Sequence, residues 1–171
     1  MRWGGTILPG MSILLVCTGN TCRSPMAAAL LREAIRLGPV LRSVGIEVSP
    51  AGTGAVAGAP ATTLAMDTMK RRGIALDGHR ARQVSTELVG SVDLVLTMAA
   101  SHKAAILGTY RGVPQDVFTL AKYSGTKRDV VDPLPIGTAE AYEACAVQLA
   151  GMIPILLERL RRQTNRCAEN A

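Results

Sequence analysis

Four short apolar runs mark this chain of 171 residues, separated by longer segments in which apolar and polar residues follow a helical spacing. The runs are apolar at nearly every position, as in parallel strands that are covered on both faces. They occupy residues 12–16, 46–49, 92–98 and 117–120. The pattern therefore predicts four buried strands.

Helices are predicted between these strands. Residues 25–37 place Met26, Leu30 and Ala34 on one side and charged residues on the other, and Gly38 ends the segment. Further helices are predicted from about residue 60 to residue 73, at 101–107 and at 138–162, with loops at 50–60 and 121–137.

The alternation of strands and helices predicts an α/β fold, here a flavodoxin-like three-layer sandwich with a central four-stranded parallel sheet. A chain of this length forms one domain, which we expect to span residues 11–163. Residues 1–10 are expected to be a disordered extension and residues 164–171 a disordered tail.

The segment between the first strand and the first helix, residues 17–25, reads CTGNTCRSP. The N–H groups of such a loop and the positive end of the helix dipole form a site for an anion of phosphate size. Ser24 is expected to cap the helix and Pro25 to be its first residue. Cys17 would then lie beneath the phosphorus of a bound phosphoryl group, while Arg23 would meet two of its oxygens.

The same positive field favours a thiolate at Cys17, which is fit for nucleophilic attack. Two other interpretations are a loop that only binds phosphate and a cysteine buried as a small apolar residue. A nucleotide-binding P-loop would end in Gly-Lys-Ser/Thr, which this loop lacks.

The loop, extended to CTGNTCRSPMA, resembles the phosphate-binding loop of the low-molecular-weight protein phosphatases, and among them the bacterial protein arginine phosphatases. Residues 91–98, 116–120 and 129–133 add to this resemblance. It implies that Cys17 is the nucleophile, that Arg23 binds phosphate, and that the product is inorganic phosphate. The remaining phosphate- or substrate-binding positions would be Thr18, Gly19, Asn20, Thr21, Cys22 and Ser24.

Attack on phosphorus requires a proton donor for the leaving group. Asp132 is the candidate, because Pro133 after it favours an extended backbone that can hold the carboxyl group over a pocket. The resemblance places the general acid at the same Asp-Pro pair. Asp129 is close in sequence, but we interpret it as a loop or turn residue.

Three further residues support or qualify the site. His79 resembles a family histidine that braces the loop asparagine, although a lone surface histidine is the ordinary alternative. Leu134 stands where we expect an aromatic residue in the family, which weakens tyrosine specificity and leaves the guanidinium pocket in doubt. His102 is interpreted as solvent-exposed.

Net charge and composition limit the classes of binding partner that the chain suits. The chain carries a formal charge of +6 but only 3% aromatic residues, so a stacking platform for nucleic acid is not expected. Lys70, Arg71 and Arg72 are interpreted as an ordinary cationic helix end, with a docking face for an acidic protein as the alternative. The apolar stretch 144–157 is too short to span a bilayer.

The four cysteines, at positions 17, 22, 145 and 167, show neither zinc spacing nor a secretory disulfide framework. We therefore expect a cytoplasmic protein with no metal and no cofactor. Cys22 could form a reversible disulfide with an oxidised Cys17.

Phosphorylated proteins are the expected substrates, with phosphoarginine favoured because the Thr21 hydroxyl can accept from a guanidinium N–H. Tyrosine phosphatase is the alternative. An arsenate reductase would carry further cysteines near residues 91–100, and a non-catalytic phosphoprotein binder would lack the thiol or the acid.

Overall fold

The computed structural model describes residues 10–114 and 116–168, and its centre is a parallel sheet. Four strands lie in the order β2-β1-β3-β4. They are β1 (Ser12–Cys17), β2 (Glu47–Gly52), β3 (Leu94–Thr97) and β4 (Val117–Thr119). All neighbouring pairs are parallel, so the carboxyl ends of the strands meet at one edge, and Cys17 ends a central strand there.

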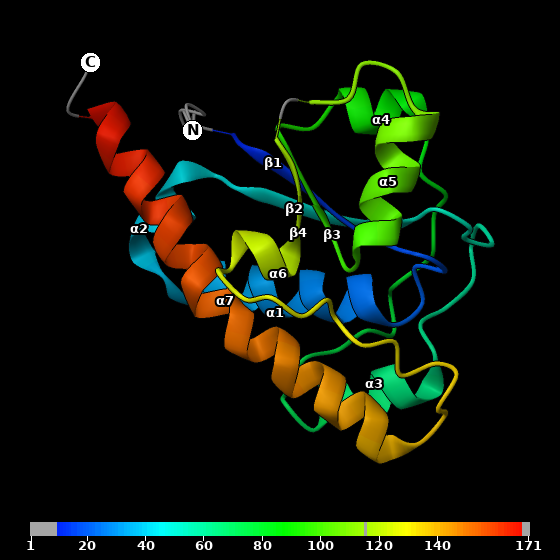
Figure 1. The fold of residues 1–171 in the computed structure, drawn as a ribbon. Coiled ribbons are helices and arrows are strands. Elements are labelled where there is room, and N and C mark those ends of the chain that lie inside the picture. Colours follow the sequence, from blue (N-terminus) through cyan, green and yellow to red (C-terminus); the bar gives the residue numbers. More distant parts are fainter. Residues whose placement is uncertain (1–9, 115, 169–171) are drawn as a thin grey trace.

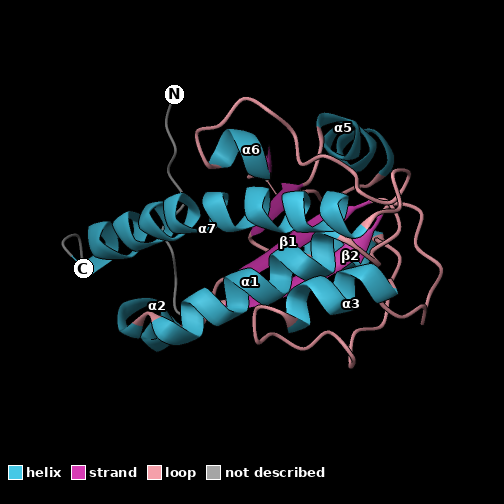
Figure 2. Cartoon of the chain, turned by 90° about the horizontal axis from the view of Figure 1, so that it is seen from below, coloured by secondary structure: helices cyan, strands magenta, loops and turns pink. Residues whose placement is uncertain are grey.

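Helices cover both faces of this sheet, which confirms the predicted three-layer sandwich (Figures 1 and 2). Helices α1 and α7 lie on one face, with α3 beside them, and α4 and α5 lie on the other. The helices are α1 (Arg23–Leu37), α2 (Pro39–Val44), α3 (Thr63–Lys70), α4 (Thr86–Gly90), α5 (Ala100–Thr109), α6 (Leu120–Tyr123) and α7 (Ala139–Ala168).

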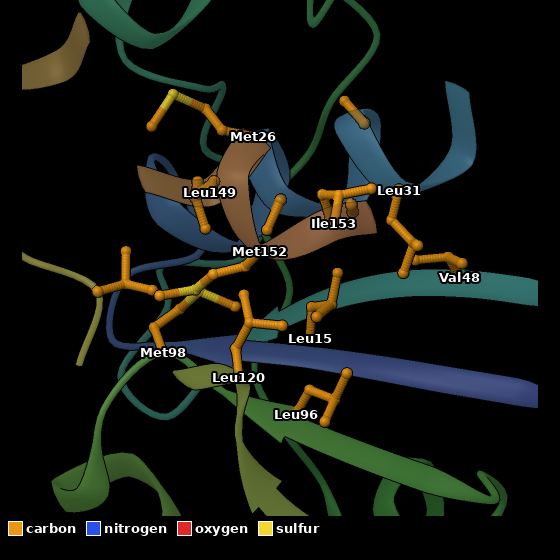
Figure 3. Packing of buried hydrophobic residues seen from close by; sticks show 14 of the residues in the cluster. Leu15, Met26, Leu31, Val48, Leu96, Met98, Leu120, Leu149, Met152 and Ile153 are labelled. Atoms are coloured by element: carbon orange, nitrogen blue, oxygen red, sulfur yellow. The ribbon is translucent and has the colours of Figure 1, made fainter. Parts of the chain in front are cut away.

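Alternate residues of the strands enter two separate cores. Leu15 and Leu96 belong to the larger cluster under α1 and α7, whereas Leu14, Val16 and Val95 belong to the smaller one under α4 and α5. Figure 3 shows the larger cluster, in which the sheet-side residues Leu15, Leu96 and Leu120 face Met152 and its neighbours on α7. Each fully buried side chain of this size contributes about 1.5–3 kcal/mol, so this double burial holds β1 rigidly in place.

Strand β2 runs to Gly52, so the predicted loop at residues 50–60 begins too early. Pro50 suggested a loop, but β2 is an edge strand, where a missing N–H costs no ladder bond. The outward carbonyls are capped by arginines: Arg32 Nε and Nη2 donate to Val48 O at 2.9 and 2.6 Å, and Arg82 Nε donates to Pro50 O at 2.9 Å. The edge is thereby closed to pairing with another strand.

The short helices were the least visible in the sequence. Helices α2 and α4 were not predicted. Helix α6 begins at Leu120, the last residue of the predicted fourth strand, and continues into the predicted loop 121–137. Each has six residues or fewer, which is too short to display a helical repeat of apolar residues.

Helix α7 is longer than predicted and continues past residue 162 to Ala168. The predicted disordered tail therefore begins inside this helix, because the added residues include neither glycine nor proline. Residues 139–162 are long and apolar enough to cross a membrane, so the argument from length was wrong. Leu149, Leu156 and Leu160 are nevertheless buried in the core, as expected of a helix that packs on a sheet.

At the other end, residues 1–9 of the predicted extension lie outside the described residues. Gly10 is tied to the domain, because its N–H donates to Val44 O at 2.9 Å. Arg71 and Arg72 at the end of α3 form ion pairs with Glu143 of α7, in line with a structural role for that cationic helix end.

Candidate active site

The loop after β1 joins Cys17 to the first residue of α1, Arg23, as the sequence predicts. Asn20 adopts a left-handed backbone with φ of 54°, which lets five residues turn from the strand into the helix. The N-terminal end of this 15-residue helix lies behind the loop, so its dipole favours an anion there.

Asn20 is completely buried and fixes the loop from within. Its Nδ2 donates to Ser24 Oγ at 2.9 Å, and its Oδ1 accepts from Arg82 N at 2.9 Å. His79 Nε2 lies 2.6 Å from Asn20 O, and it must donate because a carbonyl only accepts. The structure thus places His79 as the brace that the resemblance implies, and burial lowers the pKa of its imidazole, against the bond to Asn20 that raises it.

Two polar groups contact the Cys17 sulfur. Asn20 N donates to Sγ at 3.3 Å, and Ser24 Oγ lies 3.0 Å from it. Ser24 accepts from Asn20, so its own hydrogen is left for Cys17 or for Ala51 O at 3.3 Å. These contacts fix the position of the sulfur at the base of the loop.

Ser24 was expected to cap the helix, and this expectation is wrong. The cap position is Cys22, which makes no side-chain cap bond, and Ser24 lies one residue inside α1. The hydroxyl faces the sulfur instead, because the helix begins two residues earlier than predicted.

Gly52 was missed by the sequence analysis. A Cβ atom on it would lie 2.3 Å from Thr18 O and 2.9 Å from Asn20 N, so only glycine allows β2 to approach the loop so closely. The following N–H groups of Thr53 and Gly54 donate to Cys17 O and Thr18 O at 2.9 and 3.0 Å. The residues after β2 therefore hold the loop through main-chain hydrogen bonds.

Arg23 and Asp132 come together across 109 residues of sequence. Arg23 Nη2 donates to Asp132 Oδ2 at 2.5 Å, and Asp132 Oδ1 accepts from Leu134 N at 3.1 Å. Arg23 is buried, whereas the Asp132 side chain is one-third exposed. The candidate acid thus stands at the mouth of the phosphate loop, in direct contact with the candidate phosphate-binding arginine.

The start of the Asp132 loop is anchored to its surroundings. Val130 N donates to Met98 O at 2.9 Å, and Gln148 on α7 accepts from Val131 N and donates to Asp129 O. Asp129 Oδ2 accepts from Ala100 N at 2.8 Å, so it serves the start of α5, as its interpretation as a turn residue predicts. Gln148 carried no signal in the sequence, because a polar residue within an apolar helix does not reveal its partner.

His102 is not solvent-exposed, so that prediction is wrong. Its side chain is buried with 6% exposure, and Nε2 lies 2.9 Å from Thr18 Oγ1. Thr18 Oγ1 also accepts from Arg23 Nη2 at 3.5 Å. His102 Nδ1 is buried and has no hydrogen-bond partner among the described residues. Burial, followed by the charge of Arg23, lowers the pKa of His102 and so favours its neutral form, against Asp132 and Asp129, which raise it.

The remaining loop residues differ in what they present. Thr21 is half-buried, its carbonyl accepts from Thr62 N at 2.9 Å, and its hydroxyl has no hydrogen-bond partner within the described part of the chain. A side chain at Gly19 would meet that hydroxyl at 3.5 Å. Cys22 packs into the larger core cluster, so only its main chain is available to an anion. Leu134 is 52% exposed beside Asp132.

Comparison with known proteins identifies the family of this chain. Residues 12–166 match the model of the low molecular weight phosphotyrosine protein phosphatases. The chain belongs to this phosphatase family. The protein is therefore an enzyme with a phosphatase site, and the resemblance seen in the sequence is confirmed.

Within the family, the phosphatase is similar to members with two different names. It is 38% identical over 152 residues to a protein-arginine-phosphatase of Geobacillus stearothermophilus, covering 88% of this chain and 97% of the relative. It is 39% identical over 122 residues to a probable low molecular weight protein-tyrosine-phosphatase, EpsP, of Ralstonia solanacearum, covering 71% and 77%.

A solved structure of the YwlE arginine phosphatase, a cysteine-to-serine mutant with a phosphorylated active site serine, matches with a TM-score of 0.80. The sequences are 35% identical over 88% of this chain and 96% of that one. The phosphatase therefore belongs to the branch that contains the arginine phosphatase.

Proposed function

We propose that this phosphatase hydrolyses phosphoarginine in proteins through a phosphocysteine intermediate. The observation that carries the mechanism is the convergence of Cys17, Arg23 and Asp132 at one site. Expected partners are phosphorylated proteins, with inorganic phosphate as the product, and neither nucleic acid nor membrane is required. A cytoplasmic location suits the three free, buried thiols Cys17, Cys22 and Cys145.

In the first step, the Cys17 sulfur attacks phosphorus and the bond from phosphorus to the guanidino nitrogen breaks. Asp132 protonates this leaving nitrogen, while Arg23 and the loop N–H groups stabilise the equatorial oxygens. In the second step, Asp132 takes a proton from water, the oxygen attacks phosphorus, and the sulfur leaves as a thiolate. Phosphate is released and the starting enzyme is restored.

The choice of phosphoarginine rests on Thr21. Its hydroxyl has no partner within the described residues and can accept from a guanidinium N–H of the substrate. Against a phenyl ring the same hydroxyl would go unpaired, at a cost of about 1–3 kcal/mol. Tyrosine phosphatase stays the second candidate, because the EpsP relative carries that name. Leu134 counts against it, since it supplies no aromatic ring to pack on a phenyl group.

Side-by-side rates on phosphoarginine and phosphotyrosine peptides test this assignment. The unmodified enzyme should prefer phosphoarginine, and Thr21→Ile should shift the ratio of the two kcat/KM values towards phosphotyrosine by roughly 5- to 150-fold. Thr109→Ile, on the exposed end of α5, is the matched control and should leave the ratio unchanged. A preference for phosphotyrosine in the unmodified enzyme would show that the arginine assignment is wrong.

We further propose that peroxide inactivates the enzyme reversibly through Cys22. Peroxide converts the Cys17 thiolate into a sulfenic acid; the Cys22 sulfur then attacks it, forming a disulfide and releasing water. Burial, followed by the neighbouring Cys145 and Cys17, raises the pKa of the Cys22 thiol, so Cys22 is the less reactive of the two thiols towards peroxide itself.

Cys22→Ser should prevent recovery of activity by dithiothreitol after peroxide, since Cys17 then oxidises further. Cys145→Ser removes another buried thiol and should recover like the unmodified enzyme. Equal recovery in Cys22→Ser would show that Cys22 only fills space.

A further inference from the structure

A basic cavity lies beside the catalytic loop, on the flank formed by α1, the edge strand β2 and residues 73–82. It has a volume of about 630 Å³, within the range of small-molecule sites. Cys17, Arg23 and Asp132 do not line it. None of the roles described so far requires a cavity at this place.

The charges of this cavity are unbalanced. Its lining carries four arginines, Arg32, Arg36, Arg80 and Arg82, and a single acid, Glu33. Glu33 is already used, because Arg36 Nε and Nη2 donate to its two oxygens at 2.8 and 2.7 Å. Arg32 and Arg82 form no ion pair in the part of the chain that the structure describes. Burial, followed by the charge of Arg82, lowers the pKa of Arg32, as expected of two neighbouring cations.

The guanidinium groups of Arg32 and Arg82 keep unused N–H donors after they have capped the sheet edge. Arg32 uses Nε and Nη2 on Val48 O, and Arg82 uses only Nε on Pro50 O. Among the described residues, Arg32 Nη1 and both Nη atoms of Arg82 have no acceptor. A guanidinium group offers five N–H donors in a planar fork that suits phosphate and carboxylate oxygens. Two such forks, held in place by their bonds to β2, are oriented in advance for an anion.

Part of the lining is apolar. An inorganic ion alone would not cover this apolar surface. It is formed by Pro25 and Ala29 on α1 and by Ile74 and Leu76 on the loop after α3. A ligand with an anionic head and a compact apolar body matches both parts.

Two lining residues also hold the catalytic loop. His79 Nε2 donates to Asn20 O at 2.6 Å, and Arg82 N donates to Asn20 Oδ1 at 2.9 Å. Asn20 N in turn donates to the Cys17 sulfur. A ligand that draws Arg82 or displaces His79 would therefore shift the residue that sets the loop's shape.

We propose that this cavity binds a small organic phosphate, held by Arg32 and Arg82, and that its occupancy changes the turnover rate through Asn20. The proposal does not depend on which phosphorylated side chain the enzyme hydrolyses, since any substrate of the catalytic site can report the effect.

Phenylphosphonate is a suitable probe, because its carbon–phosphorus bond is not hydrolysed and its ring represents the apolar body. Calorimetric titration of the full chain should give two sites. Binding at the catalytic loop should appear as competitive inhibition of 4-nitrophenyl phosphate turnover. Binding at the cavity should change kcat at saturating substrate. In the double variant R32Q/R82Q the second site should weaken by about tenfold per arginine, while competitive inhibition persists.

R111Q removes the same charge from an exposed position outside the cavity and should retain both sites. R82Q alone serves if the double variant does not fold, since its main-chain bond to Asn20 survives. A single site in the unmodified enzyme, or a second site that R82Q leaves intact, would overturn the proposal. A second site without any effect on kcat would overturn the coupling through Asn20.

Discussion

The phosphate loop and the Asp132 loop meet at the Arg23–Asp132 ion pair, yet they are built in opposite ways. Cys17, Asn20 and Ser24 are buried, and both polar atoms of the Asn20 amide are bonded within the protein. In the Asp132 loop, Val131, Leu134 and Ile136 are 60%, 52% and 58% exposed. The fixed loop suits the phosphoryl group, which is the same in every substrate, and the open loop suits the part that varies.

The largest effect is expected from removing the acid while leaving its loop intact. Asp132→Asn should lower kcat by roughly 10² to 10⁴, because the leaving nitrogen loses its proton donor, and phosphate should still bind to the unchanged phosphate loop. Steady-state rates and phosphate inhibition measure the two effects separately.

Asp129→Asn is the matched control on the same loop. It should keep kcat within a few-fold, because Asp129 only accepts from Ala100 N and an amide oxygen can replace it. Equal losses in the two variants would mean that Asp132, too, is only structural.

A smaller effect is expected from His102, which positions the phosphate loop from its outer side. His102→Gln should lower kcat roughly 2- to 12-fold, the value of one hydrogen bond to Thr18 if it is expressed in the transition state. Because His102 acts through Thr18, the substitution should cost nothing further in a Thr18→Val background, which a double-mutant cycle measures. Additive losses in kcat would mean that His102 does not act through Thr18.

The pH dependence of stability offers a second readout for the same variant. The folded protein keeps His102 neutral, through burial and Arg23 and against Asp132 and Asp129. The unfolded chain therefore binds more protons, so stability should fall as pH drops below about 6.5, by at most about 1.4 kcal/mol per pH unit for this group. Denaturant unfolding of His102→Gln should show a shallower fall.

The sequence predicted what depends on local pattern. The uniform apolar runs identified both-face burial of β1 and β3, and the spacing of Cys17 and Arg23 identified the phosphate loop. Asp132 could be named because a proline follows it and the family resemblance supports it. Each of these features is recorded in a few consecutive residues, although the meeting of Asp132 with Arg23 is not.

The features missed or misjudged depend on contacts between distant segments. His102 seemed an ordinary polar residue, and only the meeting of α5 with the loop buries it against Thr18. Pro50 signals a loop unless β2 is known to be an edge strand. The need for Gly52 arises from the approach of β2 to Thr18 and Asn20, which no local pattern records.

The central claim, that the phosphoryl group passes through Cys17, can be tested by trapping the intermediate. The enzyme is mixed with 4-nitrophenyl phosphate, quenched within milliseconds in neutral denaturant, and its peptides are examined by fragmentation mass spectrometry. We expect a burst of nitrophenol close to one per enzyme molecule, with phosphate on Cys17. Cys17→Ser should show no such burst and no normal turnover. Phosphate on another residue, or normal turnover in Cys17→Ser, would contradict it.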